Sequence, residues 1–105
     1  MAILTISSSD FTAEVLKAAE PVLVSFEANC NNTCQILATN LEALAAKHRE
    51  IKVCRLKVVD APDLVERYQI MSVPSLLFFY NGELRHRAIG AQTPEALTAL
   101  LDKIL

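Results

Sequence analysis

The chain has 105 residues, of which 52% are hydrophobic, and its formal net charge at pH 7 is -2. This amount of apolar material suits one domain over residues 1–105 with a core of its own, and it excludes a disordered chain. The lysines and arginines are scattered along the sequence, which excludes a basic nucleic-acid-binding surface and makes nucleic acid an unexpected partner.

The N-terminal segment and the number of cysteines indicate the cellular compartment. The first six residues lack the basic start and the apolar run of a signal peptide, and no apolar run reaches the roughly 18 residues of a membrane span. We therefore expect a cytoplasmic protein without a membrane partner. Three cysteines in a reducing compartment favour a catalytic, redox, metal-binding or buried role over a structural disulfide framework.

The first quarter of the chain predicts a strand, a helix and a second strand. Residues 3–6 alternate weakly and predict a short strand, and the polar residues 7–10 offer N-cap oxygens to a first helix. Pro21 ends this helix and starts residues 22–26, an apolar run interrupted only by Ser25. A run that is apolar on both faces is typical of a central strand with helices on either side.

A long amphipathic helix follows the central strand. One face of this helix carries residues at helical spacing, namely Leu37, Leu41, Leu44, Ala45 and His48. Residues 51–59 are rich in β-branched side chains and predict a third strand. Pro62 then opens a short helix, since proline is tolerated in a first turn.

The last third of the chain predicts a hairpin and a final helix. Residues 76–80 read as a strand, and Asn81-Gly82 is a favoured hairpin turn, so residues 83–89 are expected to pair antiparallel with that strand. Thr93 and Pro94 supply an N-cap and a first-turn proline for the last helix. The order is βαβαβαββα, which predicts an α/β fold with a mixed five-stranded central sheet and helices on both faces.

Two of the three cysteines, Cys30 and Cys34, lie between the central strand and the long helix. Unpaired N–H groups and the helix dipole favour an anion such as a thiolate at a helix N-terminus. A cysteine there can have a pKa below the free value of about 8.5, which makes it a better nucleophile at neutral pH. The third cysteine, Cys54, is next to Arg55 in a predicted strand, so its side chain points to the other face of the sheet and is expected to be buried and unreactive.

These segments resemble the thioredoxin family over nearly the whole chain. The matching residues are Phe26, Ala28, Cys34, Tyr68, Val73-Pro74, Leu77-Phe78, Asn81-Gly82-Glu83 and Gly90. In that family a strand leads to a Trp-Cys-Gly-Pro-Cys motif at the start of the second helix, and a cis-proline follows further along the chain. The resemblance implies the thioredoxin fold and thiol-disulfide oxidoreductase activity on protein substrates, without a bound organic cofactor.

The same comparison shows where this chain departs from the family pattern. Cys34 matches the second, resolving cysteine, whereas Asn31 stands at the position of the nucleophile and Cys30 at that of the tryptophan. The motif is therefore Cys-x-x-x-Cys and lacks the stiff Gly-Pro. Ser25 replaces a buried aspartate that the resemblance implies as a proton relay, and Glu27 replaces a tryptophan. Slow proton transfer and a weak reductase are the expected consequences.

Cys30 and Cys34 are the candidate catalytic residues. In a regular helix, residues four apart have Cα atoms about 6 Å from each other, inside the disulfide range of about 4.4–6.8 Å, but their Cβ atoms are too far apart. A disulfide between them therefore requires Cys30 to lie outside the helix. In the functional interpretation, Cys30 attacks the substrate disulfide and Cys34 resolves the mixed disulfide. Such a bridge is expected to be strained and reducible. The alternative is that Cys30 is a loop residue, Cys34 is a packed helix residue, and the pair never cycles.

The candidate substrate-binding residues lie around Pro74, which is expected to follow a cis peptide bond. An extended peptide can then pair with the adjacent backbone by β-type hydrogen bonds. The resemblance maps a shallow apolar groove onto Val58, Ser72, Val73, Gly90 and Ala91. An exposed groove of this kind favours a protein partner. The resemblance also implies an electron donor of the thioredoxin-reductase type.

Two other functions stay open from the sequence. A redox-inactive adaptor or chaperone-like module would use the groove around Pro74 without working cysteines, as in family members with a single motif cysteine. Metal carriage is the third function, since the copper-carrying Sco proteins also use Cys-x-x-x-Cys on this fold. His86 is predicted on a strand away from the cysteines, so no metal site is expected. His48 and His86 are predicted at the surface, and Arg55 is predicted either to face solvent or to pair with Glu27.

Overall fold

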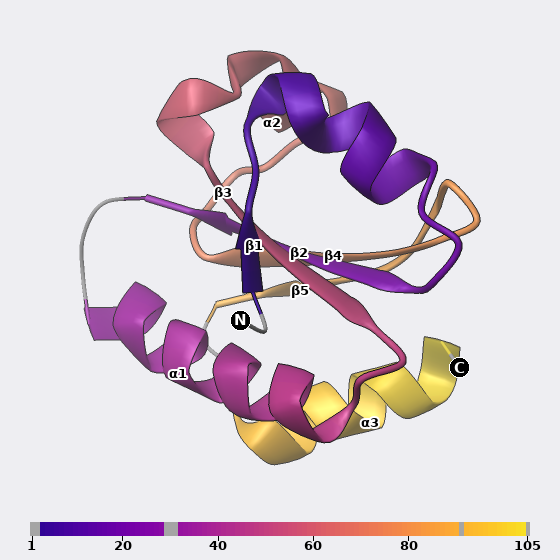
Figure 1. The fold of residues 1–105 in the computed structure, drawn as a ribbon. Coiled ribbons are helices and arrows are strands. Elements are labelled where there is room, and N and C mark those ends of the chain that lie inside the picture. Colours follow the sequence, from indigo (N-terminus) through magenta and orange to yellow (C-terminus); the bar gives the residue numbers. More distant parts are fainter. Residues whose placement is uncertain (1–2, 29–31, 91, 105) are drawn as a thin grey trace.

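The computed structural model describes residues 3–28, 32–90 and 92–104, with side chains for all of these except 32–34 and 104. Its elements follow the predicted order (Figure 1). The strands are β1 (Ile3–Thr5), β2 (Val22–Glu27), β3 (Lys52–Lys57), β4 (Ser75–Tyr80) and β5 (Glu83–Ile89). The α-helices are α1 (Asn32–Lys47), α2 (Pro62–Arg67) and α3 (Pro94–Ile104), and shorter helical turns are η1 (Ser8–Asp10), η2 (Thr12–Leu16) and η3 (Val58–Asp60).

The five strands form one mixed sheet in the order β1-β3-β2-β4-β5. As the apolar run predicted, β2 is central, and it pairs parallel with β3 and antiparallel with β4. Phe26 lies opposite Leu56 of β3 and Ser75 of β4, and Ser75 lies opposite Ile89 of β5. The ends of β2, β3 and β5 and the start of β4 therefore meet at one edge of the sheet, called here the carboxyl edge.

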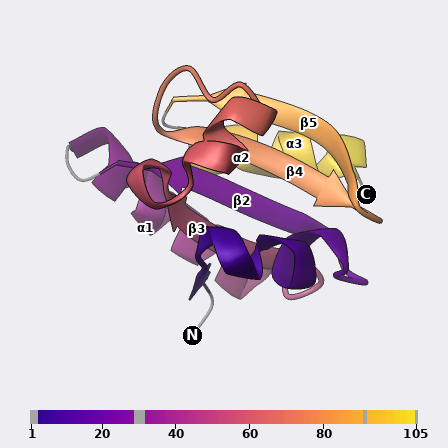
Figure 2. The same ribbon diagram turned by 90° about the horizontal axis from the view of Figure 1, so that it is seen from above.

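Helices cover both faces of the sheet, as predicted (Figures 1 and 2). On the face of α1 and α3, a buried cluster includes Leu23, Leu37, Leu41, Val53, Leu76, Phe78, Leu97 and Leu101. On the face of η2 and α2, a second cluster includes Phe11, Val15, Val22, Val24, Phe26, Cys54, Leu64, Leu77 and Phe79. Side chains alternate along a strand, so Ser25 and Glu27 share the face of Leu23, which α1 covers.

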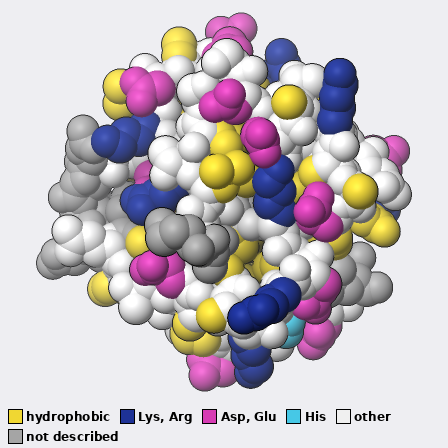
Figure 3. Space-filling model, viewed as in Figure 1, with side chains coloured by type: hydrophobic (Ala, Val, Ile, Leu, Met, Phe, Trp, Pro, Cys, Tyr) yellow, Lys and Arg dark blue, Asp and Glu magenta, His cyan; other side chains and the backbone are white. Residues whose placement is uncertain are grey.

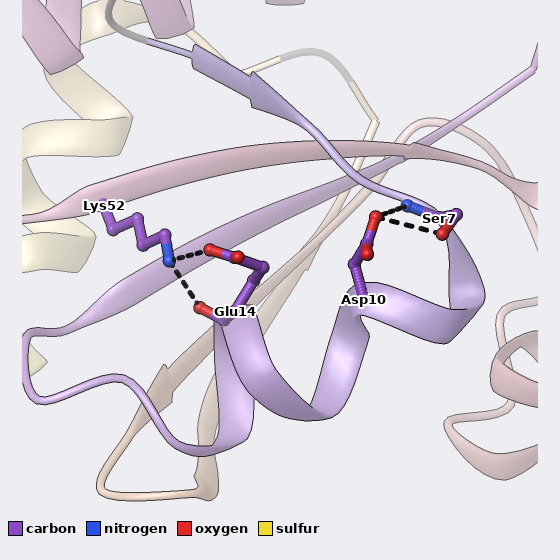
Figure 4. A network of polar contacts seen from close by, with 4 residues as sticks. All are labelled: Ser7, Asp10, Glu14 and Lys52. Atoms are coloured by element: carbon purple, nitrogen blue, oxygen red, sulfur yellow. Dashed lines mark hydrogen bonds and ion pairs between the residues drawn. The ribbon is translucent and has the colours of Figure 1, made fainter.

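The first predicted helix is not a regular α-helix. It consists of the 3₁₀ turn η1 and the π-helical turn η2, whose last turn is widened by a bond from the Lys17 N–H to the Thr12 carbonyl at 2.9 Å. Asp10 closes η1 by accepting hydrogen bonds from the N–H and hydroxyl of Ser7 at 3.1 and 3.0 Å (Figure 4). The sequence predicted the N-cap oxygens but not this change of helical pitch.

An ion pair joins η2 to β3. The Lys52 ammonium donates to the Glu14 carboxylate at 2.6 Å and to the Glu14 carbonyl at 2.9 Å, as Figure 4 shows. Elsewhere, acidic and basic side chains are interspersed over the face drawn in Figure 3. This mixture agrees with the scattered charges of the sequence.

The later elements follow the predictions with one shortened strand. β3 ends at Lys57 and not at residue 59, because residues 58–60 turn into η3 with a bond from the Ala61 N–H to the Val58 carbonyl at 3.1 Å. Asn81 and Gly82 have φ of 54° and 78°, which a two-residue hairpin turn of the predicted kind requires. Among the helices that the structure describes, none combines the length and the hydropathy that crossing a bilayer demands.

Candidate functional site

The cysteine-bearing segment connects the end of β2 to the start of α1. Both views place these two ends on the same side of the molecule, at the carboxyl edge of the sheet (Figures 1 and 2). Cys34 is the third residue of α1, so its backbone belongs to the first turn, where helix N–H groups have no partner within the helix. Cys30 and the side chain of Cys34 lie outside the described residues, and the geometry of the pair remains a prediction.

The segment around Pro74 lies at the same edge. The peptide bond between Val73 and Pro74 is cis, as expected. Pro74 is buried, and its carbonyl accepts a hydrogen bond from the Gly90 N–H at 2.8 Å. The Ser75 hydroxyl donates to the Ser72 carbonyl at 2.6 Å, which folds the preceding turn back on the strand. These bonds tie the start of β4 to the end of β5, next to the end of β2.

The remaining predicted groove residues are partly exposed. Val58 follows the end of β3 and packs against the cluster under α2. Ser72 is exposed, Val73 and Gly90 are half-buried, and Ala91 lies outside the described residues. Within the described part of the chain, no group bonds to the backbone of Val73. The fold thus brings Val58, Ser72, Val73, Pro74 and Gly90 to the edge where α1 begins.

Four exposed apolar side chains adjoin the predicted site residues in sequence. They are Ile36, Val59, Met71 and Ile89, which are 56, 69, 89 and 61% exposed. Sequence analysis missed them because they lie in turns, at a strand end and on the outer face of a helix, where periodicity does not identify a binding surface. Their signal is adjacency, since each stands within two positions of a predicted site residue.

A buried carboxylate lies on the sheet face beneath α1. The Glu27 side chain is 6% exposed, and one of its oxygens accepts a hydrogen bond from the Arg55 guanidinium at 2.7 Å. Its other oxygen accepts from the Ser25 hydroxyl at 3.0 Å. Ser25 does stand where the family has its buried aspartate, but the region is not without a buried acid, because residues two apart in a strand share a face and Glu27 lies on the face of Ser25. Of the two fates predicted for Arg55, the structure has the pair with Glu27.

Cys54 is inert, as the sequence predicted. Its side chain is fully buried in the cluster between the sheet and α2. Burial raises the pKa of the Cys54 thiol to about 11, and the nearby charge of Lys52 opposes this rise only in part. The thiol is free and protonated at neutral pH, so it is a poor nucleophile.

The two histidines are less exposed than predicted. His48 follows the last turn of α1, where its side chain is 20% exposed and its Nδ1 lies 3.4 Å from a Glu50 oxygen. His86 lies opposite Phe78 in the hairpin, and its ring packs edge-on against that phenyl ring. Among the residues that the structure describes, no group of three or more His, Cys, Asp or Glu side chains is arranged to hold a metal ion.

This topology, with a cis-proline and a cysteine-bearing helix start at one sheet edge, defines a thioredoxin-like domain. The Thioredoxin family model matches residues 2–103. The chain is 35% identical over 105 residues to a thioredoxin of Acidithiobacillus ferridurans, which covers 99% of this chain and 97% of the relative. It is 31% identical over 101 residues to a thioredoxin of Pseudomonas aeruginosa, with 95% and 94% covered. The chain therefore belongs to the thioredoxin family.

A third relative is named as both a thioredoxin reductase and a thioredoxin. The chain is 31% identical over 101 residues to a bifunctional thioredoxin reductase/thioredoxin of Mycobacterium leprae, which covers 95% of this chain and 22% of that protein. Membership of the family supports thiol-disulfide oxidoreductase chemistry as the functional class.

Proposed function

We propose that this protein is an atypical thiol-disulfide oxidoreductase that acts on protein disulfides through Cys30 and Cys34. The observation that carries the proposal is that Cys34 lies in the first turn of α1, and that α1 begins on the side of the molecule where β2 ends and where the cis bond of Val73-Pro74 leads into β4. Unpaired N–H groups and the helix dipole favour a thiolate at such a position. Family membership supports the same chemistry.

The proposed reaction has two exchange steps. The Cys30 thiolate attacks one sulfur of the substrate disulfide, and the other substrate sulfur leaves as a thiolate. Cys34 then attacks the Cys30 sulfur, so that a Cys30–Cys34 bond forms and the bond to the substrate breaks. The substrate gains two electrons and the cysteine pair loses two. The protein side of the reaction needs no organic cofactor.

The substrate would bind along the carboxyl edge. The backbone of Val73, to which no described group bonds, is available for β-type pairing with an extended peptide. The exposed side chains of Val59, Met71 and Ile89 supply apolar contact area beside it. Val58, Ser72, Pro74, Gly90 and Ala91 complete the proposed substrate-binding set.

The oxidised pair needs an electron donor. We include a donor of the thioredoxin-reductase type, because the Mycobacterium leprae relative carries both names in one protein. The proposal places the protein in the cytoplasm, where thiols are kept reduced. Replacement of the stiff Gly-Pro by Asn31-Asn32-Thr33 leads us to expect a slow reductase.

Insulin reduction with dithiothreitol as donor tests the activity directly. Cys30→Ser and Cys34→Ser should each abolish turnover, whereas Cys54→Ala should retain it because Cys54 is buried. Mass spectrometry after mild oxidation should show loss of two hydrogens localised to Cys30 and Cys34, reversed by dithiol. Absence of turnover in the parent protein, together with free thiols under oxidant, would overturn the proposal.

A redox-inactive binding module is the second candidate function. The exposure of Met71 and Val59 favours it, since apolar contact area of this kind needs no thiol chemistry. The two functions separate in one comparison: the oxidoreductase loses its capture of disulfide-containing proteins in Cys30→Ser. The binding module keeps its partner in that variant and loses it in Met71→Asp. Protection of both thiols from alkylation only when copper is present would favour metal carriage.

A further inference from the structure

We propose that Asn40 and Gln92 are positioning residues for substrate binding, because together they fix the backbone of Gly90 beside Pro74. This inference rests on the proposed function, since it concerns the same groove. It assigns a role to two polar side chains that neither exchange step uses. Neither residue was predicted from the sequence to belong to the site.

The end of β5 lacks a donor that an ordinary pair of strands would have. The outermost pair in the register of β4 and β5 is Ser75 with Ile89. Gly90 follows opposite Pro74, and its N–H donates to the Pro74 carbonyl at 2.8 Å. Two residues that face each other in this way normally exchange two backbone hydrogen bonds. Proline has no N–H, so Pro74 cannot return a bond to the Gly90 carbonyl.

The Gln92 side chain supplies the missing donor. Its Nε2 donates to the Gly90 carbonyl at 3.3 Å and to the Ile89 carbonyl at 3.0 Å. Both acceptors are carbonyl oxygens, so the amide must present its nitrogen to them. These two bonds hold Gln92 against the end of β5, and through Gly90 they connect it to Pro74.

Asn40 connects Gln92 to the cysteine-bearing helix. Its Nδ2 lies in the middle of α1 and donates to the Gln92 carbonyl at 2.8 Å. The helices α1 and α3 cover the same face of the sheet, and Gln92 lies two residues before α3 begins (Figures 1 and 2). A continuous path of hydrogen bonds therefore runs from α1 through Gln92 and Gly90 to Pro74.

Packing alone does not hold the residues at this end of β5. Gly90 and Gln92 are half-buried and Thr93 is exposed, and none of the three belongs to either buried cluster. Asn40 is also a poor choice for the interior of a helix, where alanine or leucine is more favourable. Within the described part of the chain, its side chain makes one polar contact, the bond to Gln92. The hydrogen bonds of Asn40 and Gln92 therefore position this backbone.

The position of this backbone affects peptide binding. Hydrogen bonds of the β type need donor–acceptor distances near 2.9 Å, so a displaced strand binds a peptide less well. Pro74 adjoins Val73, whose backbone pairs with the substrate in the proposed function. A site that is already held in its binding conformation loses less conformational entropy when the substrate binds. Loss of the Asn40 or Gln92 bonds should therefore weaken the binding of protein substrates and leave the thiol chemistry intact.

The first experiment measures insulin reduction at increasing insulin concentration, with dithiothreitol in excess. Asn40→Ala should raise the KM for insulin about fivefold, which is the effect of one lost hydrogen bond, and change kcat by less than about twofold. Alanine is the better helix former, so this variant is expected to fold. The rate with a small aryl disulfide, which does not fill the groove, should stay within about twofold of the parent rate.

An isosteric variant separates the hydrogen bond from packing. Asn40→Asp keeps the shape of the side chain but replaces the donating NH₂ by an oxygen, so it should raise the KM for insulin at least as much as Asn40→Ala. Thr39→Asp is the matched control, because it adds the same charge at the neighbouring, exposed position, whose hydroxyl bonds only within α1. It should retain the parent KM. A parent-like KM in Asn40→Asp would overturn the inference.

The second experiment tests whether the two side chains act through one path. Gln92→Leu removes both side-chain bonds to the end of β5 and should raise the KM for insulin about fivefold. The double variant Asn40→Ala/Gln92→Leu should exceed the larger single effect by less than about twofold, because either change already breaks the path. Single effects that multiply in the double variant would contradict a shared path.

The third experiment tests the positioning without a substrate, by amide hydrogen exchange followed by NMR. In Asn40→Asp the Gly90 amide should exchange about fivefold faster, whereas the Leu77 amide in the core of β4 should keep its parent rate. Thr39→Asp should leave both rates unchanged. An unchanged Gly90 rate in Asn40→Asp, or an equal rise at Leu77, would overturn the inference. Absence of insulin turnover in the parent protein refutes the proposed function instead, and the exchange of Gly90 then decides the positioning alone.

Discussion

Removing the positive partner of the buried carboxylate should destabilise the protein clearly. In Arg55→Gln, Glu27 keeps its place under α1 but loses the guanidinium that lies 2.7 Å from its oxygen. The Ser25 hydroxyl remains as a donor at 3.0 Å, so the carboxylate keeps one hydrogen bond but no counter-charge in contact. The cost is the free energy of holding a largely unpaired charge in a site that is 6% exposed.

The exposures of the two side chains set the expected magnitude. Breaking a fully buried ion pair costs about 3–5 kcal/mol, whereas exposed pairs contribute roughly 0.2–1 kcal/mol. Here one partner is 6% exposed and the other 41%, which places the pair between these limits. We expect Arg55→Gln to lower the free energy of unfolding by about 2 kcal/mol. Glu27→Gln should cost less, because the half-exposed guanidinium that it leaves can be hydrated.

Urea unfolding at pH 7 followed by circular dichroism measures this difference. The Arg55→Gln midpoint should fall by roughly 1 M with an unchanged slope. A double-mutant cycle with Glu27→Gln isolates the coupling, which we expect at about 1.5 kcal/mol. Arg85→Gln is the matched control, since Arg85 and Glu83 form an exposed pair at 3.2 Å whose loss should cost less than about 1 kcal/mol.

A coupling free energy that is no larger for the Glu27–Arg55 pair than for the Glu83–Arg85 pair would refute this reasoning. It would mean that water reaches Glu27 in solution.

Three further predictions follow from single contacts. Cys54→Ser should lower the free energy of unfolding by about 1–3 kcal/mol, because it buries a hydroxyl among apolar side chains, and Cys54→Ala should lower it by less. Thermal unfolding compares the two variants with the parent protein. Alkylation of the native protein at pH 8 should leave Cys54 unmodified. Gly82→Ala should cost about 1–2 kcal/mol in urea unfolding, since Gly82 has φ of 78° and a Cβ would lie 3.1 Å from the Leu16 carbonyl; Gly90→Ala, with φ of 86° and open space, should cost less. Partial burial lowers the pKa of Lys52, but its hydrogen bond to Glu14 and the attraction between the two charges outweigh this effect and leave the pKa raised. The stability lost in Glu14→Gln should therefore be present at neutral pH and vanish as the pH rises past the raised pKa of Lys52. A difference between parent and Glu14→Gln that persists at high pH would contradict this last assignment.

The sequence by itself determined the order of the helices and strands and which of their residues lie in the core. The doubly apolar run at residues 22–26 identified the central strand, because a strand buried on both faces has no polar alternation. Helical spacing placed Leu37 and Leu41 inside, and Asn81-Gly82 fixed the hairpin, because few residue pairs adopt that turn. Each of these patterns spans a few neighbouring residues, and interactions between residues close in sequence are enough to determine the structure that it predicts.

Only the tertiary structure decided the partners of the polar groups at the site. Ser25 and Glu27 are ordinary strand residues in the sequence, and nothing local shows that Arg55, 28 positions away from Glu27, points at the carboxylate. Strand register makes that pair, since Ser25 lies opposite Arg55 and Glu27 shares their face. The exposure of Met71 and Val59 was decided in the same way, because it depends on which elements fail to cover them. Long-range pairing sets burial and charge contacts, and therefore the chemistry available at the end of β2.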